Sequence, residues 1–128
     1  MRILLDTHAF LWWLAGHLSL SRSARVAINA SGSDVFVSAA SAWEIATKYR
    51  LGKLPEAELV ALDVMASIGS QQFTPLSISV DHGRAAGALP GSHRDPFDRM
   101  LIAQAMIEDL TLVSNERVFD AYGVKRLW

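Results

Sequence analysis

Four acidic residues stand at positions from which they can act together on a bound cation. Asp6 comes directly after the apolar run RILL, and Glu116 follows the run LTLVS. Glu44 and Asp98 lie in the first two turns of predicted helices. Two carboxylates about 4 Å apart, at an effective dielectric constant of about 20, repel by about 4 kcal/mol, and a divalent cation removes that repulsion. Ligands that offer only oxygen select Mg²⁺ or Mn²⁺ over Zn²⁺, so the four acids predict a site for one of these ions.

Each of these acids also has a structural explanation when it is taken alone. Asp6 can cap the helix that follows it, and Glu44 is spaced four residues from Lys48, as in a solvent-exposed ion pair on a helix. Asp98 stands three residues after Asp95 in the first turn of a helix, where its charge complements the helix dipole. The fourth acid can simply begin a short helix. These alternatives stay open for single residues, whereas chance explains the joint pattern less well.

Short apolar runs alternate with helical patterns along the chain, and this alternation predicts the elements that must position the acids. We expect strands over residues 2–5, 35–37, 73–78, 110–114 and 124–128. We expect helices over residues 7–15, 21–30, 38–49, 55–68, 79–89, 95–106 and 116–122. Strands that alternate with helices of about ten residues indicate a parallel sheet covered on both faces. Right-handed crossovers bring the carboxyl ends of the strands to one edge, which is where sites form in such sheets.

Composition limits the class of protein. The 128 residues suffice for one domain and are too few for two of ordinary size, so we expect a single domain over residues 1–128. Apolar residues make up 51% and charged residues 20%, which is typical of a globular core and not of a disordered chain. Twelve basic and thirteen acidic residues give a net charge of −1, so any nucleic acid must be bound through a local site.

The absence of cysteine excludes disulfide scaffolds, thiolate zinc sites and cysteine nucleophiles. A chain without cysteine fits a reducing compartment, and we expect a cytoplasmic protein. The most apolar run covers residues 9–15 and is far shorter than the roughly 20 residues that span a membrane. We therefore expect no membrane association.

Four blocks of the sequence occur in the order found in a known family. They are LLDTHAFLWWL (4–14), SAASAWEIATKYRLGKL (38–54), HRDPFDRMLIAQA (93–105) and LTLVSNERVFDAYGV (110–124). With these blocks the chain resembles PIN-domain ribonucleases, and within them the VapC toxins of bacterial type II toxin–antitoxin pairs. The resemblance implies a three-layer α/β/α PIN-like domain with a central, mainly parallel sheet. It also implies an endoribonuclease that hydrolyses RNA phosphodiester bonds with Mg²⁺ or Mn²⁺, a cognate VapB-type antitoxin and a homodimer.

The resemblance assigns the acidic site to Asp6, Glu44 and Asp98, which would hold the metal. Glu116 stands where the family usually has an aspartate, and its longer side chain favours contact with the metal through water. Further residues are expected around these acids: Asp95 and Ser114 as helix cap or as partners behind the ligands, Arg94 and Arg99 as contacts to the RNA backbone, and His8 and His93 as contacts to phosphate or as local hydrogen-bonding groups.

Two functions of other classes remain open. The first is a phosphatase that uses Asp6 as a covalent nucleophile, although phosphatases that resemble haloacid dehalogenases usually carry a second aspartate where this chain has His8. The second is a non-catalytic binding module of the same fold without metal affinity, a reading that the glutamate at position 116 favours. Titration with Mn²⁺ separates the binding module from the enzyme.

Overall fold

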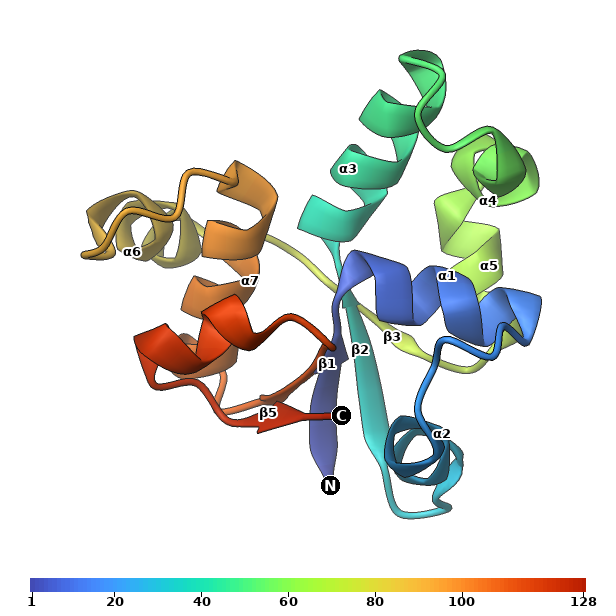
Figure 1. The fold of residues 1–128 in the computed structure, drawn as a ribbon, viewed down its shortest axis with the longest axis horizontal. Coiled ribbons are helices and arrows are strands. Elements are labelled where there is room, and N and C mark those ends of the chain that lie inside the picture. Colours follow the sequence, from blue (N-terminus) through green and yellow to red (C-terminus); the bar gives the residue numbers. More distant parts are fainter.

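Five strands form a sheet at the centre of the structure, and all neighbouring strands run parallel (Figure 1). The structure is a computed structural model that describes residues 1–128. The strands are β1 (Arg2–Leu5), β2 (Asp34–Ser38), β3 (Thr74–Leu76), β4 (Thr111–Val113) and β5 (Arg126–Leu127). Their order in the sheet is β3-β2-β1-β4-β5. The carboxyl end of β1 therefore lies in the middle of one sheet edge, between the ends of β2 and β4.

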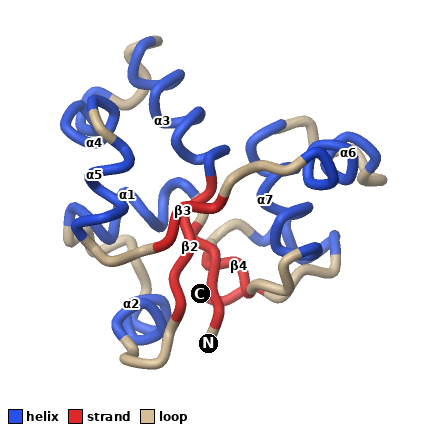
Figure 2. The backbone as a smooth tube through the Cα atoms, turned by 180° about the vertical axis from the view of Figure 1, so that it is seen from behind, coloured by secondary structure: helices blue, strands red, loops and turns tan.

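Helices cover both faces of the sheet, which confirms the expected three-layer α/β/α arrangement (Figures 1 and 2). The α-helices are α1 (Thr7–Ala15), α2 (Arg22–Asn29), α3 (Ala39–Arg50), α4 (Glu58–Leu62), α5 (Val64–Ser70), α6 (Val80–Ala88) and α7 (Pro96–Ile107), and the 3₁₀ helices are η1 (Pro55–Ala57) and η2 (Arg117–Tyr122). In the central strand, Ile3 and Leu5 belong to one core cluster and Leu4 to the other. Side chains alternate along a strand, so this short apolar run fills both cores. No helix combines the length and the apolarity that crossing a membrane requires.

The helix predicted over residues 55–68 is divided into η1, α4 and α5. The second break falls at Asp63, which leaves the helical conformation with φ −154° and ψ 82°. Its carboxylate accepts a hydrogen bond from the Ala66 N–H at 3.0 Å and thereby caps α5. An aspartate competes for backbone groups in this way and favours a cap over a helix interior.

The strands predicted over residues 73–78 and 124–128 are shorter in the structure, where they form β3 and β5. Both lie at the outer edges of the sheet. Pro75, inside β3, lacks a backbone N–H and is compatible with an edge strand, but it limits how far pairing extends. Neither edge contributes to the acidic region at the end of β1.

Polar caps at three helix starts place the acids. The Asp6 carboxylate caps α1 by accepting a hydrogen bond from the Ala9 N–H at 2.7 Å. The Ser38 hydroxyl caps α3, and the Asp95 carboxylate caps α7 by accepting hydrogen bonds from the N–H groups of its first turn. All three helices begin near the carboxyl edge of the sheet (Figure 1). The acids lie at or within two turns of these helix starts, Asp6 as the cap of α1, Glu44 in the second turn of α3 and Asp98 in the first turn of α7, so they lie near one another.

The smaller core cluster fastens α7 to the sheet. Leu101 and Ile102 of α7 are buried together with Leu4 of β1 and Leu112 of β4. Phe119 of η2 completes this cluster and is 0% exposed. The packing of this ring therefore helps to fix the helix that carries Asp98.

Phe119→Ala is expected to lower the free energy of unfolding by about 3–5 kcal/mol, because it removes a fully buried ring and leaves a cavity beneath α7. Urea denaturation followed by circular dichroism measures the change. Leu18→Ala is the control, since Leu18 is 93% exposed and its truncation should change stability by less than about 0.5 kcal/mol. Equal effects of the two substitutions would contradict the packing described here.

Candidate active site

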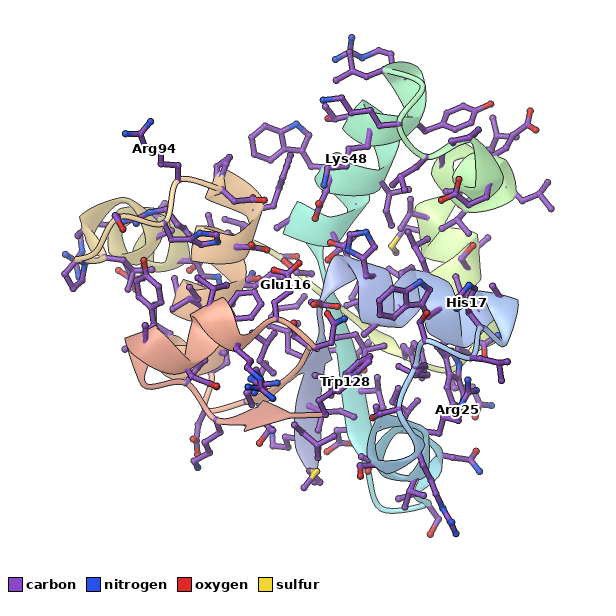
Figure 3. The ribbon with its side chains drawn as sticks, in the orientation of Figure 1. His17, Arg25, Lys48, Arg94, Glu116 and Trp128 are labelled. Atoms are coloured by element: carbon purple, nitrogen blue, oxygen red, sulfur yellow. The ribbon has the colours of Figure 1, made fainter.

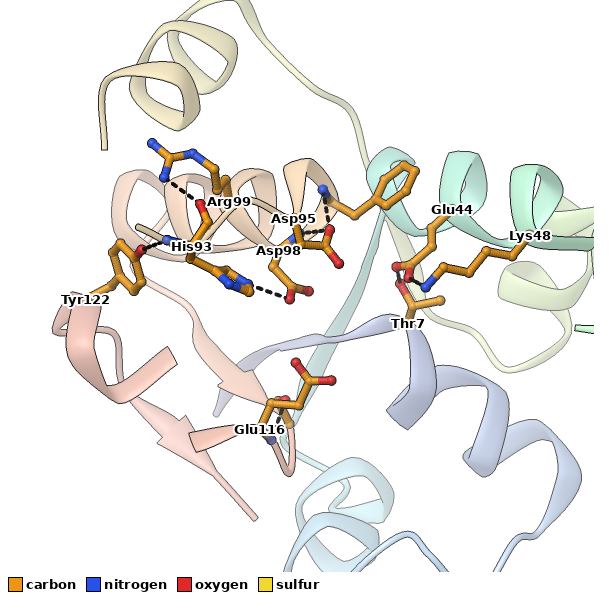
Figure 4. A network of polar contacts seen from close by, with 11 residues as sticks. Thr7, Glu44, Lys48, His93, Asp95, Asp98, Arg99, Glu116 and Tyr122 are labelled. Carbon is orange, nitrogen blue, oxygen red and sulfur yellow. Dashed lines mark hydrogen bonds and ion pairs between the residues drawn. The ribbon is translucent and has the colours of Figure 1, made fainter. Parts of the chain in front are cut away.

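Acidic side chains from four elements lie at the carboxyl edge of the sheet. Asp6 follows β1 and Glu116 follows β4, whereas Glu44 and Asp98 come from α3 and α7. Glu44, Asp98 and Glu116 point toward the same region between α3, α7 and the end of β1 (Figure 4). The charge of Glu116 acts on both Asp6 and Asp98. The expected convergence of the acids on one edge is thus present in the structure.

Asp6 is both a helix cap and a member of the acidic cluster. Its side chain is deeply buried, with only 5% of the residue exposed. Burial raises the pKa of Asp6 to about 6, and the negative charge of Glu116 adds to this rise. Hydrogen bonds from the Ser114 side chain and the Ala9 N–H, and the nearby charge of His8, act to lower the pKa. The capping explanation and the functional explanation of Asp6 therefore do not exclude each other.

Asp98 is the second acid whose charge the surroundings disfavour. Burial raises its pKa to about 7, and the negative charges of Asp95 and Glu116 act in the same direction. His93 opposes this rise, because its Nε2 and the Asp98 Oδ2 are hydrogen-bonded at 2.8 Å. Of the two roles expected for His93, the structure shows the local hydrogen bond.

Glu44 is held by its own chain at both carboxylate oxygens. The Thr7 hydroxyl donates a hydrogen bond to Oε1 at 2.6 Å, and the Lys48 ammonium donates to Oε2. The i,i+4 pair anticipated from the sequence is present, but it is not a solvated surface pair, since the Glu44 side chain is only 6% exposed. Figure 4 shows Thr7 and Lys48 meeting this carboxylate on the side of α3 that faces the other acids.

Glu116 is the exposed member of the cluster. Its side chain does not cap the 3₁₀ helix that follows, so the helix-start explanation does not account for its carboxylate. Its backbone N–H donates to the Ser114 hydroxyl at 3.0 Å. Ser114 is fully buried and interacts with Asp6 as well, so it ties the end of β4 to the end of β1. Figure 3 shows the Glu116 side chain near the centre of the molecule, beside the end of β1.

The two arginines expected to contact RNA differ in the structure. Arg94 is exposed and points away from the acids (Figure 3). Arg99 instead binds its own backbone: its guanidinium donates to the carbonyls of Ala86 at 3.0 Å, Leu89 at 2.5 Å and His93 at 3.0 Å. Arg99 therefore fixes the loop between α6 and α7, which explains its presence without any contact to RNA.

The loop that carries His93 is also held from η2. The His93 N–H donates to the Tyr122 hydroxyl at 3.2 Å. Gly91 adopts a φ of 94°, and a Cβ at this position would lie 2.8 Å from the same hydroxyl. A side chain here would therefore be strained by the backbone and would clash with Tyr122. The sequence offered no signal for this contact, because the two segments are far apart in the chain.

His8 lies next to the cluster. Its positive form acts on Asp6 and lowers the pKa of that carboxyl. Its ring also packs against Trp12, with 5.6 Å between the ring centroids.

As the side chains stand, no three or more His, Cys, Asp or Glu residues converge closely enough to hold a metal ion. Glu44 faces Lys48 and Asp98 faces His93, so these acids are engaged by partners within the chain.

Comparison with known proteins agrees with the sequence resemblance. The PIN domain family matches residues 3–125. The chain is 32% identical to the ribonuclease VapC22 of Mycobacterium tuberculosis over 120 residues, which cover 90% of this chain and 87% of that protein. It is 44% identical to the ribonuclease VapC16 of the same organism over 59 residues, which are 44% of this chain and 42% of that protein. The chain thus spans less than half of the length of VapC16.

Solved structures support the fold over the whole chain. VapBC2 from Rickettsia felis, solved with a DNA fragment from its promoter, aligns with a TM-score of 0.73 at 18% identity and covers 99% of this chain and 98% of that chain. A toxin–antitoxin complex from Klebsiella pneumoniae aligns with a TM-score of 0.64 at 18% identity, covering 98% of this chain and 96% of that chain. At such identities the alignments show a shared fold.

The raised pKa values of Asp6 and Asp98 predict how the stability of the metal-free protein depends on pH. Both acids hold a proton more tightly when folded than when unfolded, where an aspartic acid titrates near 3.8. Their stabilising contribution is complete below that value and is lost as pH rises through about 6 and about 7. The Asp98→Asn protein lacks the ionisation of this acid and does not lose the corresponding stability. Its melting temperature should therefore rise relative to that of the wild type as pH rises from about 5 to about 8.

Thermal melts of both proteins in EDTA measure this difference. Asp34→Asn is the control, because Asp34 is an exposed acid at the other end of β2. A difference in melting temperature between Asp98→Asn and the wild type that stays constant over this pH range would contradict the electrostatic description.

Proposed function

The chain belongs to the PIN domain family, as the VapC ribonucleases do, and from this membership we propose that it is an endoribonuclease that hydrolyses RNA phosphodiester bonds with a divalent cation. The observation that carries the proposal is the pair of aspartates at the end of β1 and the start of α7. Both are shielded from solvent, and the pKa of each is raised, to about 6 for Asp6 and to about 7 for Asp98. Helix capping accounts for one carboxylate, but not for crowding several together.

The residues fit a hard divalent cation. Every acidic donor in the cluster is a carboxylate, and oxygen ligands suit Mg²⁺ and Mn²⁺. Asp6 is buried and Asp98 half-buried, and their burial and like-charged neighbours disfavour the negative charge of both, so a cation that neutralises them stabilises them. We propose that Asp6 and Asp98 hold this ion, that Glu44 joins them or orients a water, and that Glu116 contributes from the exposed side through water.

When bound, the divalent cation lowers the pKa of a water and offsets the charge of the phosphate. The chain's own residues set the geometry. The Ala9 N–H fixes the Asp6 carboxylate, His93 fixes the Asp98 carboxylate, and Ser114 joins the ends of β1 and β4. Pre-set ligands of this kind reduce the reorganisation that a bound substrate would otherwise require.

We further propose that the protein is the toxin of a toxin–antitoxin pair and that a VapB-type antitoxin is its partner. The solved structures of similar fold that contain such complexes support this proposal. A homodimer, a cytoplasmic location and a single domain over the chain are further predictions from the sequence. Membership of the PIN domain family argues against the phosphatase alternative. The non-catalytic binding module is the alternative that the experiments below decide.

Asp6→Asn is expected to reduce RNA cleavage by about 100-fold or more, since even groups that only support metal ligands change activity by about 10- to 100-fold. Asparagine is a good helix cap, so α1 should remain capped. Cleavage of a labelled RNA in Mg²⁺ and in EDTA measures the effect, with Asp34→Asn as the control that retains wild-type activity. Near wild-type cleavage by Asp6→Asn, or equal cleavage in EDTA, would count against the proposal.

The two aspartates of the Asp95-Pro96-Phe97-Asp98 segment should separate by role. Asp95→Ala removes the α7 cap and should lower the free energy of unfolding by about 0.5–2 kcal/mol while measurable cleavage remains. Asp98→Ala should keep stability near pH 8 without metal, because the removed charge is buried among other acids, but should lose cleavage. Melting curves and cleavage rates on both variants test this contrast, and the opposite pattern would mean that the two roles are exchanged.

A further inference from the structure

Lys48 is a basic residue that contacts one acid of the site. It lies in the third turn of α3, one turn beyond Glu44, and its ammonium donates to the Glu44 Oε2. The Lys48 side chain is 31% exposed, whereas that of Glu44 is only 6% exposed. The pair therefore lies at the boundary between the buried part of the site and solvent.

The charge of Lys48 reaches beyond Glu44 into the rest of the cluster. Partial burial acts to lower its pKa, but the hydrogen bond and charge of Glu44 and the charges of Asp95 and Asp98 outweigh burial and raise it. A lysine ammonium is positively charged at neutral pH. Lys48 thus places a positive charge in contact with Glu44 of α3 and within reach of the charges of Asp95 and Asp98 at the start of α7.

The other basic residues near the acids do not share this position. Arg99 is occupied by backbone carbonyls of the loop before α7. Arg94 points away from the acids into solvent (Figure 3). Lys53, just past the end of α3, is exposed. Among the lysines and arginines, Lys48 is therefore the one that pairs directly with an acid of the cluster, whereas His8 and His93 act on Asp6 and Asp98.

Glu44 cannot serve Lys48 and a divalent cation equally well. Both Glu44 oxygens already accept a hydrogen bond, from Thr7 and from Lys48, so a cation that uses Glu44 must share this carboxylate with Lys48. An ammonium and a divalent cation on the same carboxylate repel each other strongly in a partly buried site. An ion that uses Glu44 therefore weakens or displaces the contact between Lys48 and Glu44.

We propose that Lys48 is a positioning residue that serves as the counter-cation of the acidic site in the metal-free protein and yields Glu44 when a divalent cation binds. The inference rests on the proposed function, because it assumes that the site takes such an ion. Lys48 holds Glu44 beside Thr7 until loading and so offsets the negative charge of Glu44 within the cluster. It also weakens the affinity for metal, and loading frees an ammonium group at the edge of the site for an RNA phosphate.

The test is the affinity for Mn²⁺ of the whole protein without RNA. The free ion is counted by electron paramagnetic resonance near pH 8, where the raised pKa values of about 6 and about 7 leave Asp6 and Asp98 ionised. Lys48→Met, which keeps much of the length without the charge, should bind Mn²⁺ about three- to tenfold more tightly than the wild type. Lys48→Arg keeps the charge and should stay within about twofold of the wild type. Lys53→Met, the matched control, should not differ from the wild type.

Lys48→Gln is titrated in parallel, so that a folding defect of the methionine variant does not decide the result, and it should also bind more tightly. Unchanged or weaker Mn²⁺ binding in the folded uncharged variants would overturn the counter-cation role. A wild-type protein that binds no Mn²⁺ at millimolar concentration would instead contradict the proposed function and the inference together. A purely structural lysine would lower stability but would not raise metal affinity when replaced.

Discussion

The burial and mutual repulsion of carboxylates that are gathered at the carboxyl edge of the sheet are the constraint on which the rest of this structure depends. The pKa values of Asp6 and Asp98 are raised well above that of an ordinary aspartic acid, mainly by burial and further by the charge of Glu116. Such an arrangement destabilises the metal-free protein as pH rises through the values at which these acids ionise. Proteins retain local instability of this kind at functional sites, where the surrounding fold must hold it in place.

The supports around the acids are contacts between segments far apart in the chain. Gln104, fully buried in α7, accepts a hydrogen bond from the Ser38 hydroxyl that caps α3, so the helices that carry Glu44 and Asp98 are joined near the sheet. Arg99 holds the backbone of the loop before α7. These contacts leave no buried side-chain polar atom without a partner. The fold therefore fixes the acids while their charges oppose one another.

The sequence predicted the parts of the fold and site that depend on local pattern. Alternating apolar runs gave the parallel sheet, and the position of Asp6 after a strand and of Asp98 after a capping Asp-Pro step brought both acids to one edge. The contacts around these acids could not be predicted from the sequence. Arg99 was expected to contact RNA but binds backbone carbonyls. The hydrogen bond between His93 and Asp98 depends on the path of a loop, which local pattern does not determine. The four-residue spacing predicted the ion pair of Glu44 and Lys48, but it did not predict the burial of Glu44, because tertiary packing determines that burial.

The central claim is that the acids at the end of β1 and the start of α7 bind one divalent cation between them. Crystals grown with Mn²⁺ and measured for anomalous scattering test it most directly, because the signal locates the ion independently of any activity. We expect an anomalous peak between the carboxylates of Asp6 and Asp98, with oxygen atoms of both at about 2.1 Å, the short distance typical of small hard cations. A peak elsewhere on the protein, or none at these two carboxylates with millimolar Mn²⁺ present, would contradict it.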